Sequence, residues 1–153
     1  MQECYNCMFR NCENLIAGPQ LSATVSAKDC YGSMFEGCIN LLEAPIIKLE
    51  NTAEGCCARM FCMSRTAKLT TPKMTKSPIL YASDVYNGCY KEMFKGNGNL
   101  VEVTCLMTTI IGCNDWLTNC STTGTFKKHP NADWPSGTSG IPIEWTAVDY
   151  VEN

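Results

Sequence analysis

Apolar and polar positions recur along this chain with a fixed spacing. A nine-residue string that opens with Cys and carries Met-Phe at its centre occurs four times, as CYNCMFRNC, CYGSMFEGC, CCARMFCMS and CYKEMFKGN. The copies begin at Cys4, Cys30, Cys56 and Cys89, so successive starts lie 26, 26 and 33 residues apart. Chance does not keep Cys, Met and Phe in phase over four units. The period therefore predicts a solenoid of stacked coils.

A second apolar segment follows each string, and it predicts a strand. The copies read NLIAGPQL, NLLEAPII, KLTTPKM and NLVEVTCL. A short apolar run closed by Pro suits a brief extended strand, because Pro removes a ladder donor. The first string places apolar side chains at i, i+1, i+4 and i+5, which favours a short helix. We therefore expect an α/β repeat with one short parallel strand and one short helix per coil of about 26 residues.

Stacking is expected to bring equivalent residues of adjacent coils to about one inter-strand spacing, ~4.8 Å. Two internal ladders follow from the phase, namely Leu15, Leu41, Leu69 and Leu100, and Phe9, Phe35, Phe61 and Phe94. The third unit carries seven extra residues. We assign them to an insertion from Lys73 to Asn87, which is either a ligand loop that uses Tyr81 and Tyr86 or a neutral surface loop.

The outward side of the strands is the candidate binding face. If Leu15 and Ala17 point into the core, Ile16 points outward, and its equivalents in later coils vary while the core stays fixed. An apolar outward row invites a protein or glycan partner, unless other parts of the same protein cover it. The predicted residues of this face are Ile16, Leu42, Glu43, Thr70, Val101 and Glu102.

The twelve cysteines are best explained as core residues. Those at the same phase, such as Cys30 and Cys56, suit a crowded interior, where free Cys behaves as a small apolar residue. Disulfides in an oxidising compartment remain an alternative for the out-of-phase members, which are Cys7, Cys57, Cys62, Cys105, Cys113 and Cys120. Cys4-x-x-Cys7 has zinc-ligand spacing but no second pair, so we expect no metal and no cofactor.

Composition and charge reduce the number of possible functions further. The 153 residues include 12 Lys and Arg against 15 Asp and Glu, a formal charge of -3, which gives no footprint for nucleic acid or an anionic membrane. We find no apolar stretch of membrane-spanning length. The single His, His129, stands in a polar stretch, and no nucleophile and base are paired, so we expect a protein that is not an enzyme.

The repeat pattern stops near Leu106, which divides the chain into residues 1–104 with four repeats and residues 105–153 as a C-terminal cap. A solenoid needs an atypical last unit to cover its open apolar end. The large side chains available for this are Trp116, Phe126, Trp134 and Trp145. At the other end no secretory signal is visible. Because Cys4 already lies inside a repeat, we expect the sequence to be a fragment of a longer protein.

These motifs resemble a known family. The string CYxxMFxGC with Leu-x-x-Ala-Pro between copies is similar to the BspA-like leucine-rich repeats of anaerobic bacterial surface proteins, and CYGSMFEGCINLLEAP is the closest copy. The segments TCLMTT, TTGTF and GIPIEW resemble the region that follows such repeats. The chain departs from the pattern at Cys57, Ser64 and Asn97 and in the third-unit insertion.

The resemblance implies a leucine-rich-repeat solenoid at a cell surface, used in adhesion to protein or glycan molecules. It gives an extracellular or cell-surface location, a non-enzymatic role and no membrane insertion as expectations. Related repeats are also expected in tail or fibre proteins of phages that infect such bacteria. The alternative function is therefore a structural or receptor-binding segment of a phage tail fibre.

Overall fold

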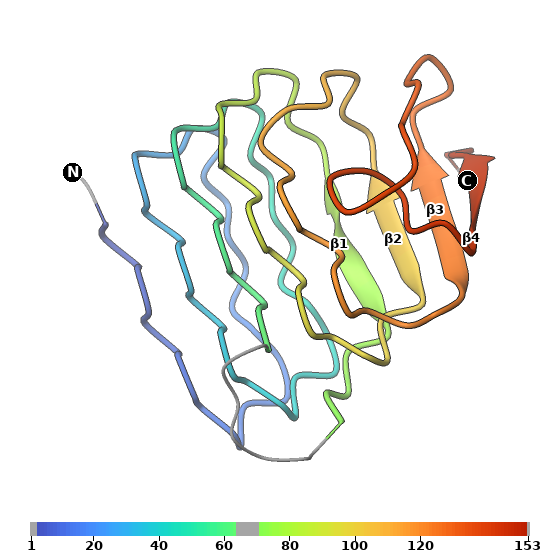
Figure 1. The fold of residues 1–153 in the computed structure, drawn as a ribbon. Coiled ribbons are helices and arrows are strands. Elements are labelled where there is room, and N and C mark those ends of the chain that lie inside the picture. Colours follow the sequence, from blue (N-terminus) through green and yellow to red (C-terminus); the bar gives the residue numbers. More distant parts are fainter. Residues whose placement is uncertain (1–2, 64–70, 153) are drawn as a thin grey trace.

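The computed structural model describes residues 3–63 and 71–152, which wind into a stack of coils with a strand side and a turn side (Figure 1). The strand side carries one parallel sheet in the order β1-β2-β3-β4. Its strands are β1 (Lys76–Leu80), β2 (Glu102–Cys105), β3 (Gly124–Lys128) and β4 (Trp145–Asp149). The arrangement is a β-solenoid-like stack, so the expected solenoid of repeats is present.

Parallel pairing continues toward the N-terminus as isolated bridges. Ala17 pairs with Glu43 and Leu21 with Ile47, each 26 residues apart. Pro19 and Pro45 lie between these bridges. Because Pro has no amide proton, the ladder cannot run through them without a break.

The expected helix in each coil is wrong, and with it the leucine-rich-repeat fold, because the described residues contain no helix. The nine-residue strings instead form turn segments, which we define as residues 3–12, 29–38, 55–63, 88–97 and 111–120. In the second of these, Asp29, Ser33 and Gly37 have φ values of +52°, +51° and +78°. A left-handed residue at every fourth position is incompatible with an α-helix.

Backbone amides in the turn segments alternate between two kinds of partner. Met34 N donates to Tyr31 O within its own coil at 3.2 Å, whereas Phe35 N donates to Met60 O of the next coil at 2.9 Å. The same alternation repeats along the first four segments, and in the second segment every amide from Asp29 to Cys38 is used either within the coil or between coils. This pattern satisfies the backbone without a helix. A turn with a four-residue period also gives the i, i+1, i+4, i+5 spacing that we interpreted as helical.

Hydrogen bonds locate the extra residues of the third coil. Leu42 N donates to Ile16 O, and Val101 N donates to Thr75 O, both at 2.9 Å, so Thr75 occupies the position of Ile16 in its coil. The extra residues therefore lie between Met63 and Thr75, not from Lys73 to Asn87. The buried Met74 takes the position assigned to Leu69, which lies outside the described residues.

The predicted Phe ladder is confirmed. Phe9, Phe35, Phe61 and Phe94 stack face to face, with ring centroids 5.4, 5.5 and 5.6 Å apart. Three of the four rings are fully buried, and only Phe9, in the first coil, is partly exposed. On the opposite side of the core, Leu41 and Leu100 are buried as expected, and Leu15 packs against the core partly buried.

The stack continues beyond the fourth sequence repeat. Phe94 N donates to Trp116 O at 2.9 Å, the same bond that joins Phe61 N to Met93 O one coil earlier. Residues 111–120 are therefore a fifth turn segment. Trp116 is fully buried, stacks on Trp134 at 5.3 Å and meets Phe126 edge to face. These rings close the C-terminal end of the core.

The last position of the turn segments carries a side-chain donor. Cys38 Sγ donates to Phe9 O at 2.9 Å, and Cys120 Sγ donates to Phe94 O at 3.2 Å. In the fourth segment Asn97 Nδ2 donates to Phe61 O and to Phe94 O. The departure from Cys at position 97 therefore keeps the bond to the preceding coil.

Candidate binding face

The backbone register aligns one outward residue from each of four coils on the strand side. We call the set Ile16, Leu42, Thr75 and Val101 the outer column. Its coils are joined directly by the bonds from Leu42 N to Ile16 O and from Val101 N to Thr75 O. Ile16, Leu42 and Val101 are 62%, 54% and 42% exposed, although they are aliphatic. Three exposed apolar side chains therefore lie in one column on the strand side. No described element covers them.

The outer column holds three of the predicted binding-face residues. Thr70 lies outside the described residues, and Thr75 fills the third-coil position instead. The sequence pattern missed Thr75 because it placed the extra residues from Lys73 to Asn87, whereas they precede Thr75. Ile46 was also missed, although it is 53% exposed on the same strand segment as Leu42. The next residue, Ile47, is buried, and this in-out alternation marks Ile46 as an outward residue.

Charged residues flank the outer column. Glu43 pairs in register with Ala17, and Lys76 pairs with Glu102. Glu43 is exposed, whereas Glu102 lies between Lys76 Nζ at 3.4 Å and Lys127 Nζ at 3.1 Å. Partial burial alone would raise the pKa of Glu102, but the hydrogen bond and charge of Lys127 outweigh it and hold that pKa below the ordinary value. The carboxylate charge of Glu102 is thus balanced within the protein.

The two predicted loop tyrosines lie away from the outer column. Tyr81 follows the last residue of β1, and Tyr86 lies just before the next turn segment, where its amide donates to the Thr52 hydroxyl oxygen at 2.9 Å. They are 47% and 56% exposed. The structure therefore does not bring them into one row with Leu42, but it leaves both rings available at the surface.

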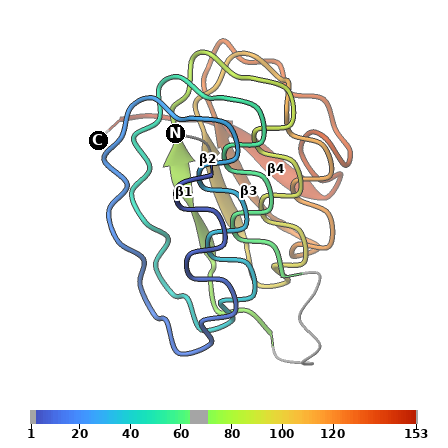
Figure 2. The same cartoon turned by 90° about the vertical axis from the view of Figure 1, so that its left-hand side faces the viewer.

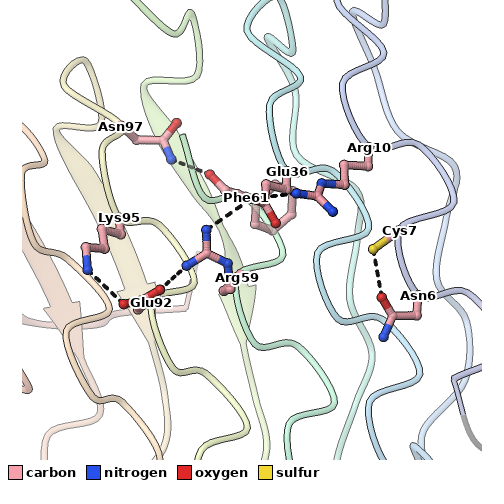
Figure 3. Close-up of polar contacts among 9 residues, drawn as sticks. All are labelled: Asn6, Cys7, Arg10, Glu36, Arg59, Phe61, Glu92, Lys95 and Asn97. Carbon is pink, nitrogen blue, oxygen red and sulfur yellow. Dashed lines mark hydrogen bonds and ion pairs between the residues drawn. The ribbon is translucent and has the colours of Figure 1, made fainter. Parts of the chain in front are cut away.

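A second set of charges crosses the turn side of four coils (Figure 3). Glu36 is 2% exposed and lies between Arg10, at 3.6 Å, and Arg59, at 3.0 Å. Arg59 also pairs with Glu92, which in turn pairs with Lys95 at 2.7 Å. We call these five residues the charge ladder. Three of the four pairs join neighbouring coils and the fourth, between Glu92 and Lys95, lies within one coil, so the ladder is mainly a coil-joining feature.

The residue types that the sequence singled out for metal binding or catalysis are His129 and the cysteines. No three His, Cys, Asp or Glu side chains in the described part of the chain come together as a metal site. The Nδ1 atom of His129 accepts a bond from Asn131 N at 3.1 Å within its own loop. All twelve cysteines fall in the described ranges and all are free thiols. Burial raises the pKa of Cys30 to about 11 and that of Cys105 to about 12, so these thiols are poor nucleophiles.

The fold defines a solenoid-like repeat protein with an apolar outer column. Comparison with protein-family models, with curated proteins and with solved structures finds no match for the chain. The described part of the chain has no helix with the length and apolar character needed to cross a membrane. Its function must therefore be inferred from the residues that it presents.

Proposed function

We propose that the chain is a non-enzymatic binding module whose outer column contacts a protein or glycan partner at a cell surface. The observation that carries this proposal is the exposure of Ile16, Leu42 and Val101 in one register-aligned row. Single exposed apolar residues are ordinary, whereas an aligned group on a flat face is typical of an interaction site. Partner binding would remove these side chains from water, which is the favourable term in most association.

Two features support a specific contact. The coils hold the row on backbone hydrogen bonds, so the face loses little conformational entropy when a partner docks. Glu43 is exposed beside the row, whereas Glu102 is already paired with two lysines. Glu43 is therefore the acid that remains to meet a donor or a cation of the partner. A glycan partner would also use the exposed rings of Tyr81 and Tyr86.

The cell-surface location and the adhesive role come from the resemblance of the repeat strings to BspA-like sequences. The near-neutral charge, -3 over the chain, agrees with a partner that is neither nucleic acid nor an anionic membrane. We propose no reaction, because His129 is engaged within its own loop and burial raises the thiol pKa of Cys30 and Cys105. The hydrogen bond with Cys57 lowers the pKa of Cys56 to about 7, but that thiol is fully buried.

A segment of a phage tail fibre is the second candidate. The observation that favours it is the regular bonding between coils along the turn side, together with the residue-by-residue pairing of β2, β3 and β4, which would make a stiff rod. In that case the outer column would face bacterial receptors or other parts of the fibre.

The test uses the labelled chain and two panels, one of host mucosal glycoproteins and matrix proteins and one of intact anaerobic bacterial cells. Leu42→Lys is compared with Val25→Lys, because Val25 is equally aliphatic and 64% exposed but lies outside the outer column. We expect Leu42→Lys to weaken binding at least about tenfold, as expected for a central interface residue. Val25→Lys should stay within about twofold.

Binding to the host panel with this difference between variants supports the adhesin. Binding to bacterial cells with the same difference favours the fibre protein. Equal binding by both variants would show that the outer column is not the site. Binding to neither panel would contradict a recognition role for this part of the chain.

A further inference from the structure

The sequence contains two Asn-Gly pairs, at residues 87–88 and 97–98, and they lie in different surroundings. In such a pair the backbone nitrogen of Gly can reach the side-chain carbonyl carbon of Asn with little hindrance, because Gly has no Cβ atom. Attack by that nitrogen forms a cyclic imide, which is the first step in the loss of the Asn amide. The hydrogen bonds around each pair decide whether the two groups are free to meet.

Hydrogen bonds hold the second pair in place. Asn97 is fully buried, and its Nδ2 atom donates to Phe61 O and to Phe94 O. Gly98 N, the atom that would attack, donates to Gly96 O at 3.0 Å. Because the side chain and the nitrogen are each engaged, their approach would break buried bonds, and buried polar groups are costly to leave without partners.

The first pair has no such restraint. Asn87 is exposed, and no described residue forms a hydrogen bond with its side chain, with its carbonyl oxygen or with Gly88 N. Figure 2 looks along the stack from the first coil, with later coils behind it. In the second coil the residue equivalent to Gly88 is Asp29, and Asp29 N donates to Glu54 O of the next coil at 3.0 Å. The peptide unit between Asn87 and Gly88 lacks that bond, so it can rotate without breaking a bond to the described chain.

A turn holds this peptide unit at the surface. Cys89 N donates to Tyr86 O at 3.2 Å, so Asn87 and Gly88 are the central residues of a β-turn. Gly88 has a φ value of +73°, and nothing lies within 4 Å of the place that a Cβ atom would occupy. Both residues line a groove of about 630 Å³. The turn therefore has room for an imide ring and access for water.

We propose that Asn87 is a site of spontaneous modification, at which the folded chain loses a side-chain amide, and that Asn97 is protected from the same reaction. Gly88 N attacks Cγ of Asn87. The new N–Cγ bond forms as the Cγ–Nδ2 bond breaks, the proton of Gly88 N passes to the leaving nitrogen, and ammonia departs. Water then opens the imide at one of its two carbonyls, which gives aspartate or isoaspartate. The reaction needs only water, and it is independent of the outer column.

The modification changes the charge of the groove beside the turn. That groove is also lined by Asp29, Glu54 and Asp115, with Lys91 among them. Either product adds a carboxylate to these acids, so the surface becomes more negative as the protein ages. Isoaspartate also adds a side-chain carbon to the backbone, inside the hydrogen bond that closes the turn. Asn87 therefore couples the age of the chain to the charge of its turn side.

The test follows both asparagines in one sample of the full chain. The folded protein is incubated in mildly alkaline buffer, and peptide mapping by mass spectrometry measures the loss of the amide at each position. We expect Asn87 to react at least about tenfold faster than Asn97, because Asn97 must first break buried hydrogen bonds. In guanidinium chloride both pairs are exposed, so the two rates should agree within about threefold.

Two variants identify the source of the isoaspartate that the folded chain forms. Asn87→Gln keeps an amide but lengthens the side chain, and it should abolish the product. Asn114→Gln is the matched control, because Asn114 is exposed on the same groove but precedes Asp115, and it should leave the yield within about twofold. Equal rates at Asn87 and Asn97 in the folded chain, or amide loss from Asn87 in denaturant only, would overturn the proposal.

Discussion

The first coils and the C-terminal segment differ in opposite ways in sequence and in structure. The first coils repeat every 26 residues, yet their strand side holds only isolated bridges. The C-terminal segment has no visible repeat, yet β2, β3 and β4 pair residue by residue. The difference follows the equivalent prolines of the strand side: Pro19, Pro45 and Pro78 interrupt the first three coils, whereas β2 to β4 contain no Pro. Periodic packing residues thus set the coil length, whereas an uninterrupted series of amide donors sets the regularity of the sheet.

Aromatic packing differs between the same two regions. The Phe rings of the first four coils stack within 10° of parallel, because the hydrogen bonds between turn segments place equivalent residues over one another even across the longer third coil. At the C-terminal end Trp116 and Trp134 meet Phe126 at 70° and 61°. These rings come from non-equivalent positions, since Trp116 takes the Met position of its turn segment and Phe126 lies on β3, and edge-to-face packing fills the core there.

The largest expected loss of stability comes from a substitution at the centre of the regular Phe stack. Phe35 is fully buried between Phe9 and Phe61, so Phe35→Ala removes two ring contacts and leaves a cavity. We expect a loss of about 3 to 5 kcal/mol in the free energy of unfolding, measured by urea denaturation. Phe9→Ala is the control, since Phe9 has a ring neighbour on one face only, and should cost about 2 kcal/mol. A loss below about 1 kcal/mol for Phe35→Ala would mean that the stack is not the core.

A smaller effect is expected from the C-terminal segment. A Cβ atom at Gly140 would lie 1.9 Å from Pro135 O, and that oxygen is fixed by the bond from Ile141 N at 2.9 Å. Gly140→Ala should therefore cost about 2 kcal/mol by overpacking. Gly98→Ala in the fourth coil is the matched control, because nothing lies within 4 Å of the added atom. It should stay within about 0.5 kcal/mol, and equal Tm values for the two variants would contradict the close approach at Gly140.

The smallest effect concerns the charge ladder and depends on pH. Burial alone would raise the pKa of Glu36, but the hydrogen bond from Arg59 and the charges of Arg59 and Arg10 outweigh it, so the pKa lies below its ordinary value of 4.5. A carboxylate with a depressed pKa stabilises the folded state above the unfolded value and loses that contribution as the pH falls through the folded pKa. Glu36→Gln should thus cost about 1 kcal/mol at pH 7.

The same variant should make Tm less sensitive to pH below about 4.5, because one of the groups that take up a proton on unfolding is gone. The matched control is Glu54→Gln, since Glu54 forms an exposed pair with Lys28 on a neighbouring coil. Exposed pairs contribute little, so this control should change Tm by less than Glu36→Gln does. A pH profile for Glu36→Gln that runs parallel to that of the unmodified chain would show that Glu36 carries no depressed pKa.

The sequence predicted the stacked coils, the Phe ladder and the exposed positions of Ile16, Leu42 and Val101, because all of these depend on phase alone. It did not predict the turn segments, since a four-residue turn and a helix give the same apolar spacing. A discriminating signal was present: residues at the left-handed positions include Gly37, Gly55, Gly88 and Gly96. Glycine at such regular spacing favours a left-handed turn over a helix.

Substitutions within the repeated string prevented recognition of the fifth turn segment. The fifth turn segment has Gly112 in place of the leading Cys, and Trp116 and Leu117 in place of Met-Phe. Each keeps the volume or backbone shape that the position needs, so packing tolerates a change that a string comparison does not. The extra residues of the third coil could not be located from the sequence. The hydrogen bond from Val101 N to Thr75 O locates them, and it joins two coils that are distant in the sequence.

The side-chain donors at the ends of three turn segments, at Cys38, Asn97 and Cys120, give the coils different responses to oxidation. Cys38 and Cys120 bond to the preceding coil through a thiol proton. Conversion of such a sulfur to a sulfinic or sulfonic acid would replace that donor with bulky acidic oxygens. Asn97 makes the equivalent bond with an amide, which has no such chemistry. The junction between the third and fourth coils therefore keeps its tether in surroundings where the thiol tethers of Cys38 and Cys120 would be lost.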